Sequence, residues 1–166
     1  MAEAVNGVPG AHVGHGHLKV ADLERAIAFY RDVIGMRVVM LYGRQAAFLS
    51  FDDYHHHLGL NTWESLGGSA PPNGHTGLYH VAFLFPDRAT LGQVIDRVLS
   101  AGYALTGAAD HSVSEAVYLN DPDGNGLELY RDRPRSEWQY DENGNPLINN
   151  TPLDVDALVT EGRAVR

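Results

Sequence analysis

Apolar residues recur at helical spacing in one early stretch of the chain, ADLERAIAFYRDVIGM, which follows the short apolar segment GHLKV. The recurring positions are Leu23, Ala26, Ile27, Tyr30 and Val33. They predict an amphipathic helix that begins after Asp22, whose side chain can cap the first turn, and ends at Gly35. Three short apolar segments separated by Gly or Asp then predict strands, at 37–42, 44–51 and 55–62.

The same order of elements recurs after a loop rich in Gly, Ser and Pro at 64–77. YHVAFLFPD predicts a strand, and the apolar spacing of 88–99 predicts a helix that ends at Gly102. Three more strands are predicted, near 103–106, 114–120 and 126–131. Asp121-Pro122-Asp123-Gly124 separates the last two strands, and this combination of residues strongly favours a hairpin turn.

A fixed spacing relates the two halves of the chain. His15 lies seven residues before Asp22, and His80 lies seven residues before Asp87, so the offset between the halves is 65 residues. Each half thus opens with a His on a strand and an Asp at the start of the next helix. Such a repeat predicts two copies of one βαβββ unit. The two predicted units span 12–64 and 77–131.

The expected fold class is therefore α+β, with two tandem βαβββ units that form a half-open, barrel-like sheet around a central cavity. Residues 132–166 are rich in Asn, Asp, Gly and Pro and show little periodicity before LDVDALV. They predict a C-terminal arm that wraps the domain or a partner subunit, with one short helix. A chain of 166 residues can bury one substantial core, so residues 1–166 are predicted to form a single domain.

The composition, 44% hydrophobic and 20% charged, is typical of globular proteins, and the net charge of -9 disfavours nucleic acid and anionic lipid as partners. No apolar run is long enough to cross a bilayer, and the first residues lack the pattern of a signal peptide. A chain without cysteine forms no disulfide, iron–sulfur cluster or thiolate zinc site. We expect a cytoplasmic protein with neither nucleic acid nor membrane as a partner, whose metal ligands are His and carboxylate.

Three residues are candidate metal ligands: His15, His80 and Glu128. The two histidines occupy equivalent strands of the repeat, and Glu128 lies between two leucines of the final strand, where an unpaired carboxylate is costly to bury. Two imidazoles and one carboxylate leave open positions that suit ferrous iron. The alternatives are hydrogen-bonded core histidines and an Arg salt bridge for Glu128. His17 shares a strand face with His15 and is expected to be a cavity residue.

Other candidates for chemistry are the run His55-His56-His57 and the pair His111 and Tyr118. Successive strand residues point to opposite faces, so at most two of the three consecutive histidines can face the cavity. They indicate acid–base work, or else an exposed His-rich turn. His111 and Tyr118 could hold a phenolic oxygen by hydrogen bonds, although a Tyr here could equally fill the core.

The chain resembles the vicinal oxygen chelate superfamily, which includes glyoxalase I, bleomycin and fosfomycin resistance proteins and type I extradiol dioxygenases. The resemblance covers roughly residues 12–135 and depends on three motifs, GHGHLKVADLERAIAFYRDVIGM, GLYHVAFLFPD and YLNDPDGNGLELY. Within the superfamily the chain is most similar to single-domain catechol 2,3-dioxygenase-like members. Many extradiol enzymes contain two such domains, whereas this sequence contains one pair of units.

The resemblance implies a metal held by His15, His80 and Glu128, with Fe(II) as the cofactor and Mn(II) as the alternative. It implies that His56, to within one residue, is the acid–base histidine, and that His111 and Tyr118 bind the substrate. Glyoxalase-type members instead carry a second carboxylate on the last strand of the first unit, where this chain has histidine.

The implied function is an extradiol ring-cleavage dioxygenase that acts on a small aromatic diol with O2, in a homodimer or higher homo-oligomer. One alternative is a glyoxalase-like metal-dependent lyase or isomerase, or a thiol transferase. The other is a metal-free, drug-sequestering binding protein.

Overall fold

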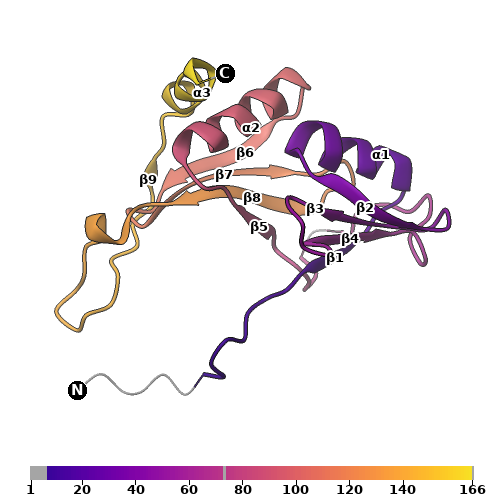
Figure 1. Ribbon diagram of the computed structural model, residues 1–166, viewed down its shortest axis with the longest axis horizontal. Coiled ribbons are helices and arrows are strands. Elements are labelled where there is room, and N and C mark those ends of the chain that lie inside the picture. The colour runs from indigo at the N-terminus through magenta and orange to yellow at the C-terminus, as the bar shows by residue number, and fades with distance from the viewer. Residues whose placement is uncertain (1–6, 73, 166) are drawn as a thin grey trace.

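The computed structural model of the protein describes residues 7–72 and 74–165. Helices cover one face of two β-sheets. The opposite face of each sheet, here called the helix-free face, is covered by no helix of the described residues (Figure 1). The elements of the first unit are β1 (Gly16–Lys19), α1 (Leu23–Ala28), a π-helical segment (Phe29–Ile34), β2 (Arg37–Tyr42), β3 (Ala46–Ser50) and β4 (Leu58–Asn61). Those of the second unit are β5 (Val81–Leu84), α2 (Arg88–Ser100), β6 (Leu105–Asp110), β7 (Ser114–Asn120) and β8 (Gly126–Asp132).

The predicted repeat is confirmed by the strand pairing. The first sheet has the order β1-β4-β3-β2, and the second has the order β5-β8-β7-β6-β9. In each unit the first strand pairs in parallel with the last, and the remaining strands pair antiparallel. The α+β class with two βαβββ units is therefore observed.

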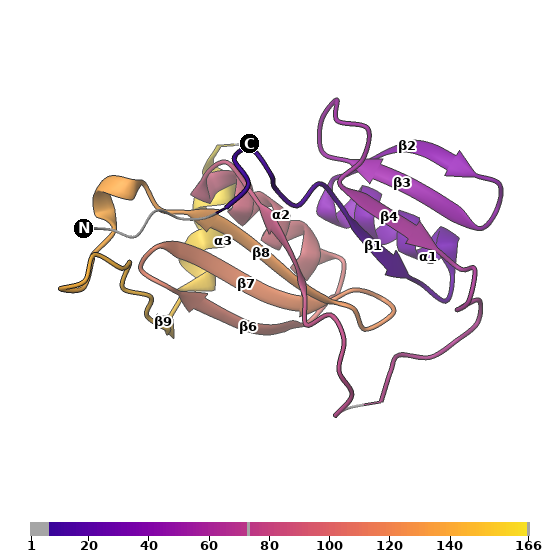
Figure 2. The ribbon, with the colours of Figure 1, turned by 90° about the horizontal axis from the view of Figure 1, so that it is seen from below.

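The two units form two sheets that lie side by side, rather than one continuous sheet (Figure 2). Their adjoining edges are β1 and β5, which approach closely: a Cβ atom on Gly16 would lie 3.6 Å from Cγ2 of Val81. Side-chain packing, not a shared ladder of backbone hydrogen bonds, joins the sheets at this edge. Neither sheet closes into a barrel.

Both helices begin at the predicted caps. Asp22 accepts a 3.0 Å hydrogen bond from the backbone nitrogen of Arg25, and Asp87 accepts one of 2.7 Å from Thr90. These bonds satisfy backbone donors that the first turn of a helix leaves free. The first helix also ends at Gly35, whose φ of 96° is left-handed. Its C-terminal half, Phe29–Ile34, is π-helical rather than α-helical, which the apolar spacing did not predict.

Two strand boundaries differ from those predicted. β4 begins at Leu58, so His55, His56 and His57 precede the strand instead of opening it, and the backbone nitrogen of His57 still donates to the carbonyl of Leu49. β6 spans Leu105–Asp110, later than the predicted 103–106. Both differences arise where Gly or His residues weaken the alternation of apolar and polar residues that predicts a strand.

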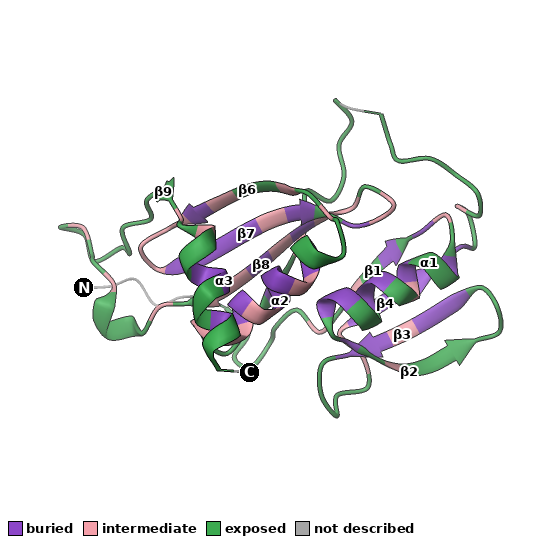
Figure 3. Ribbon diagram, turned by 90° about the horizontal axis from the view of Figure 1, so that it is seen from above, coloured by how far each residue is buried: buried purple, intermediate pink, exposed green. Residues whose placement is uncertain are grey.

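The core fills the space between the helices and the sheets, where the buried faces of both layers meet (Figure 3). Tyr30, Ile34, Leu91 and Ile95 supply the helical side. The strands supply alternate residues, including Leu58, Leu60, Leu127 and Leu129. Because side chains alternate along a strand, this packing directs the intervening residues, among them Glu128, to the helix-free face.

The predicted hairpin turn between β7 and β8 is present and docks on the first unit. The backbone nitrogen of Gly124 donates a 3.0 Å hydrogen bond to the carbonyl of Asp121, and the φ of Gly124 is 84°. The Oδ1 atom of Asp123 accepts from the nitrogen of Ala21 at 2.9 Å and from Arg25 at 2.6 Å. The turn thus fixes the start of α1 against the second sheet.

The C-terminal arm folds back over the second unit. The sequence predicts an arm that wraps either the domain or a partner subunit, and here it lies on its own domain. It contains a 3-10 turn (Arg135–Glu137), the short strand β9 (Thr151–Pro152), which pairs with β6, and the helix α3 (Val155–Ala164). α3 lies against α2 (Figure 1). The helices cross at Gly92 and Gly162, where a Cβ atom on Gly162 would lie 2.5 Å from the nitrogen of Gln93. Within the described residues, no helix has the length and hydrophobicity to cross a membrane.

Candidate active site

His80 and Glu128 lie in contact on the helix-free face of the second sheet. β5 and β8 pair in parallel with Ala82 opposite Glu128, and His80 lies two residues before Ala82, on the same face by alternation. The Nε2 atom of His80 is 2.9 Å from Oε2 of Glu128, and the side chains are 30% and 15% exposed. Glu128 therefore has a partner for its carboxylate, as its flanking leucines require.

Tyr118 and His111 extend this contact across the sheet. Tyr118 pairs directly with Glu128 in the register of β7 and β8, and its hydroxyl lies 3.3 Å from Oε1 of Glu128. The Nε2 atom of His111 lies 2.8 Å from the Tyr118 hydroxyl. A run of polar contacts thus leads from His111 through Tyr118 and Glu128 to His80.

A cavity of about 550 Å³ lies beside this run of contacts. Its lining includes His80, His111 and Tyr118 from the second unit and Asn150 from the arm. Burial, and then the negative charge and hydrogen bond of Glu128, raise the pKa of Tyr118 to about 12. The tyrosine therefore keeps its hydroxyl proton at neutral pH and can donate it to an oxygen atom in the cavity.

A second group of aromatic and imidazole rings lies on the first sheet. The ring of His15 is 4.4 Å from that of His56, measured between centroids, and His56 packs edge-on against Phe48 at 4.9 Å. The ring of His17 is 5.6 Å from that of Trp63. Burial, and then the neighbouring His15, lower the pKa of both His17 and His56, so both rings favour the neutral state.

The three consecutive histidines take different environments. His56 faces His15, whereas His57 points the other way and its Nδ1 atom lies 2.9 Å from the Ser50 hydroxyl. His55 is exposed, with its Nδ1 atom 2.7 Å from that of His56. Of the three, His56 is the one whose ring lies against a predicted metal ligand.

The predicted metal triad is brought together only in part. His80 and Glu128 supply a nitrogen and a carboxylate oxygen on one face, a donor pair that suits a divalent metal. His15 lies against His56 instead, and among residues 7–72 and 74–165 no three His, Asp or Glu side chains are placed to hold a metal. The role of His15 as a ligand stays a prediction.

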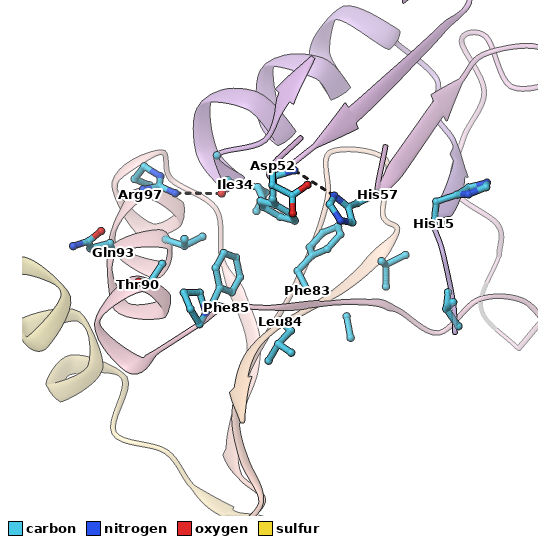
Figure 4. A pocket seen from close by; sticks show the side chains of 18 of the residues that line it. His15, Ile34, Asp52, His57, Phe83, Leu84, Phe85, Thr90, Gln93 and Arg97 are labelled. Carbon is cyan, nitrogen blue, oxygen red and sulfur yellow. Dashed lines mark hydrogen bonds between the residues drawn. The ribbon is translucent and has the colours of Figure 1, made fainter. Parts of the chain in front are cut away.

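A separate cavity of about 590 Å³ lies on the helix-covered side, between the two units (Figure 4). Phe83 and Phe85 line it together with Asp52 and His57, and Arg97 closes one end by donating hydrogen bonds to the carbonyls of Val33 and Ile34. His15 stands at its margin with its ring turned away from the phenylalanines (Figure 4). This cavity contains neither His80 nor Glu128 and is not the candidate active site.

Sequence reasoning did not identify Phe48, Trp63, Asn149 or Asn150 as site residues. Phe48 and Trp63 border the imidazoles of the first sheet, and Asn150 lines the cavity of the second. The alternation in β3 could have placed Phe48 on the helix-free face. No pattern in the arm could have placed the two asparagines, because the arm has no period.

The chain is similar in sequence to one known superfamily of proteins. The sequence model of the Glyoxalase/Bleomycin resistance protein/Dioxygenase superfamily matches residues 11–129. The chain is 45% identical over 150 residues to a catechol-2,3-dioxygenase of Bacillus subtilis (strain 168), an alignment that covers 90% of this chain and 52% of that protein. It is 36% identical over 126 residues to biphenyl-2,3-diol 1,2-dioxygenase 3 of Rhodococcus globerulus, covering 72% of this chain and 63% of the relative.

The chain thus spans about half the length of the first of these relatives and less than two thirds of the second. Among solved structures, a glyoxalase/dioxygenase from Nostoc punctiforme shares the fold, with a TM-score of 0.64 at 23% identity, covering 79% of this chain and all of that one. The match of the superfamily model to most of the chain, the paired βαβββ units and these likenesses lead to one conclusion. The chain belongs to the glyoxalase/bleomycin resistance protein/dioxygenase superfamily.

Proposed function

We propose that the protein is an extradiol ring-cleavage dioxygenase that acts on a catechol-type aromatic diol with O2. The observation that carries this proposal is the run of contacts from His111 through Tyr118 and Glu128 to His80, beside a cavity of about 550 Å³. Two relatives that match much of this chain are named as dioxygenases of aromatic diols, which supports the same class of substrate.

We assign His15, His80 and Glu128 as the metal ligands and Fe(II) as the metal, with Mn(II) as the alternative. The contact between His80 and Glu128 supports two of these assignments, and the matching position of His15 in the repeated unit supports the third. Bound iron supplies a centre at which the diol and O2 meet. Two imidazoles and one carboxylate leave positions open for both reactants.

The protein's own groups position the diol and move its protons. Tyr118 holds its proton up to a pH near its raised pKa of about 12. When the diol binds, this single hydroxyl proton turns from Glu128 and His111 to a phenolic oxygen of the diol. His111 supports the Tyr118 hydroxyl through its Nε2 atom. His56 is the acid–base residue, and its lowered pKa keeps the imidazole neutral and able to accept a proton at neutral pH.

We also propose that the protein forms a homodimer or a higher homo-oligomer. β2 is an edge strand, and its apolar residues Met40, Leu41 and Tyr42 are 52%, 58% and 63% exposed. An exposed apolar edge of this kind favours association with another chain. Light scattering coupled to gel filtration measures the molar mass, and a monomer at every concentration would contradict this part of the proposal.

The test of the function is anaerobic reconstitution of metal-free protein with Fe(II), followed by a panel of diols, including catechol and 2,3-dihydroxybiphenyl, and then air. We expect a yellow ring-opened product with at least one diol. The His80→Ala variant should lose both the colour and stoichiometric metal. His12→Ala is the matched control, because His12 is exposed and its Nδ1 atom bonds locally, to the carbonyl of Gly10.

Two other outcomes would overturn the proposal. Tight binding of one divalent metal with no product from any diol would favour the glyoxalase-like lyase, isomerase or transferase. Protein that binds no metal stoichiometrically, yet binds small molecules in the presence of a chelator, would favour the sequestering protein.

A further inference from the structure

The C-terminal arm is bonded directly to the turn that carries His111. Three hydrogen bonds join Asn149 to this turn. The Asn149 nitrogen donates to the His111 carbonyl at 3.1 Å, its carbonyl accepts from Nδ1 of His111 at 2.8 Å, and its side-chain Nδ2 donates to the Ser112 hydroxyl at 2.9 Å. The backbone of this one arm residue thus bonds to both the backbone and the ring of His111, and its side chain bonds to the next residue, Ser112.

The turn itself has an unfavourable backbone conformation. Ser112 has a φ of 67°, which makes it the one non-glycine residue in the left-handed region among those described. Its nitrogen donates a 2.8 Å bond to Asp110, and the His111 nitrogen donates a 2.8 Å bond to the Ser114 carbonyl. A residue in this region persists only where surrounding contacts hold it. The bond from Asn149 to Ser112 is one of those contacts.

The group bonded to Nδ1 of His111 determines which of the two ring nitrogens carries the proton, and so whether the nitrogen nearer Tyr118 is protonated. A backbone carbonyl only accepts hydrogen bonds, so the bond to Asn149 requires the proton of the neutral imidazole to be on Nδ1. The Nε2 atom then accepts from the Tyr118 hydroxyl, 2.8 Å away, in competition with Oε1 of Glu128 at 3.3 Å. If the carbonyl of Asn149 moved, the proton could occupy Nε2 and the ring could turn.

The arm is held in place independently of this bond. β9 pairs Thr151 and Pro152 with β6, and α3 packs on α2 beyond it. Asn150, the next residue after Asn149, lines the same cavity as His80 and Tyr118. The path of the arm along the second sheet therefore places Asn149 at His111 and leaves its neighbour facing the cavity.

We propose that Asn149 is a positioning residue: its backbone carbonyl, braced by its side chain on Ser112, fixes the tautomer and orientation of His111 toward Tyr118. The chemical consequence for turnover depends on the proposed dioxygenase function, but the tautomer itself does not. The arm therefore contributes to the site, although it lies outside the two repeated units.

The first test measures the tautomer of His111 in the full-length, metal-free protein by imidazole 15N NMR, with the signal assigned from a His111→Gln variant. The pH is about 9, above the ordinary pKa of histidine. We expect wild type to carry the proton on Nδ1 alone. Asn149→Ala, which removes the bond to Ser112, should give a mixture of both tautomers. Ser112→Ala, which removes the same bond from the other side, should give a similar mixture.

The matched control is Asn145→Ala. Asn145 is an exposed asparagine of the same arm, and its side chain bonds to Asp141, far along the chain from His111. We expect this variant to retain the wild-type tautomer. In the iron-loaded enzyme, Asn149→Ala should lower kcat roughly three- to tenfold, as the loss of one hydrogen bond allows, with the KM for the diol nearly unchanged.

Three results would overturn the inference: a wild-type protein with the proton on Nε2, an unchanged tautomer in both Asn149→Ala and Ser112→Ala, or an equal change in Asn145→Ala. Failure of the proposed function is distinguishable, because wild type would then cleave no diol while the tautomer measurement still gave its answer. Should Asn149→Ala fail to fold, Ser112→Ala alone decides the question.

Discussion

The hydroxyl of Tyr30, in the first unit, donates a 2.9 Å hydrogen bond to Oδ2 of Asp121 in the second. Both residues are buried, with exposures of 0% and 4%. The other oxygen of Asp121 accepts bonds from the nitrogens of Asp123 and Asn125, which shape the turn between β7 and β8. One buried carboxylate thus joins the helix of the first unit to the hairpin of the second.

Replacing Tyr30 with Phe should therefore destabilise the whole fold rather than one unit. We expect the free energy of unfolding to fall by about 1–3 kcal/mol, because Asp121 loses a buried donor. Urea denaturation monitored by circular dichroism measures the change. Tyr140→Phe is the control, since Tyr140 is 47% exposed and the substitution should leave the midpoint unchanged. A Tyr30→Phe midpoint equal to that of wild type would contradict the coupling.

Tyr30 should also weaken the protein at alkaline pH. Burial, and then the nearby Asp121 carboxylate, raise the pKa of Tyr30 well above its ordinary value of 10.0. As the pH rises past 10, the unfolded state loses this proton and the folded state does not, so the free energy of unfolding falls until the raised pKa is reached. The stability contribution is complete below pH 10.

Urea midpoints measured from pH about 9 to 11 should decline for wild type and decline less steeply for Tyr30→Phe, which lacks the titrating group. Tyr140→Phe should follow the wild-type curve. Parallel curves for wild type and Tyr30→Phe would show that another group controls the alkaline limb.

Glu115 lies at the centre of a buried ion cluster on the helix-covered side of the second sheet. Its carboxylate, 5% exposed, accepts from Arg131 at 2.8 Å, Arg88 at 3.1 Å and Arg133 at 3.2 Å. Arg88 also pairs with Glu161 of α3, so the cluster ties α3 to the sheet.

Glu115→Gln removes the charge that these guanidinium groups share. We expect a loss of about 3–5 kcal/mol in the free energy of unfolding, the range for removing one partner of a buried pair. Thermal and urea melts measure it. Glu137→Gln is the control, because Glu137 is 52% exposed and 3.5 Å from Arg133, and exposed pairs contribute about 0–1 kcal/mol. A loss no larger than that of Glu137→Gln would exclude this role for Glu115.

Gly92→Ala should separate α2 from α3. A Cβ atom at position 92 would overlap the backbone carbonyl of Leu158, which no rotation of a side chain can relieve. We expect a loss of about 1–3 kcal/mol from overpacking, together with faster proteolysis of the arm. Gly77→Ala is the control, because a Cβ atom there meets no atom within 4 Å. Equal proteolysis of the two variants would contradict the close crossing.

His56 and His57 should respond differently to substitution by Gln. His56 lies against His15 on the helix-free face, so we expect His56→Gln to lower ring cleavage by about 10²–10⁴-fold, as for a lost acid–base group. His57 bonds to Ser50 and lines the other cavity, so His57→Gln should keep activity and lose about 1 kcal/mol of stability. Steady-state kinetics and urea melts measure both. Loss of activity in His57→Gln alone would reverse the assignment.

The sequence by itself determined the local structure and the repeat. Hydrogen bonds and dihedral angles within a few residues produce the helix caps at Asp22 and Asp87, the helix end at Gly35 and the turn at Gly124. Neighbouring residues in the sequence therefore specify them. The alternation of Leu127, Glu128 and Leu129 determined that Glu128 would point away from the core. The offset of 65 residues then gave two units of the same topology.

Only the tertiary structure decided which of these residues meet. The parallel pairing of β5 with β8 brings His80 to Glu128, and the register of β7 adds Tyr118, whereas His15 lies with His56 on the other sheet. The sequence also did not predict that the arm, which has no apolar period, would reach His111. Such contacts join residues distant in the chain, and their geometry depends on how whole sheets and helices pack, which no local period encodes.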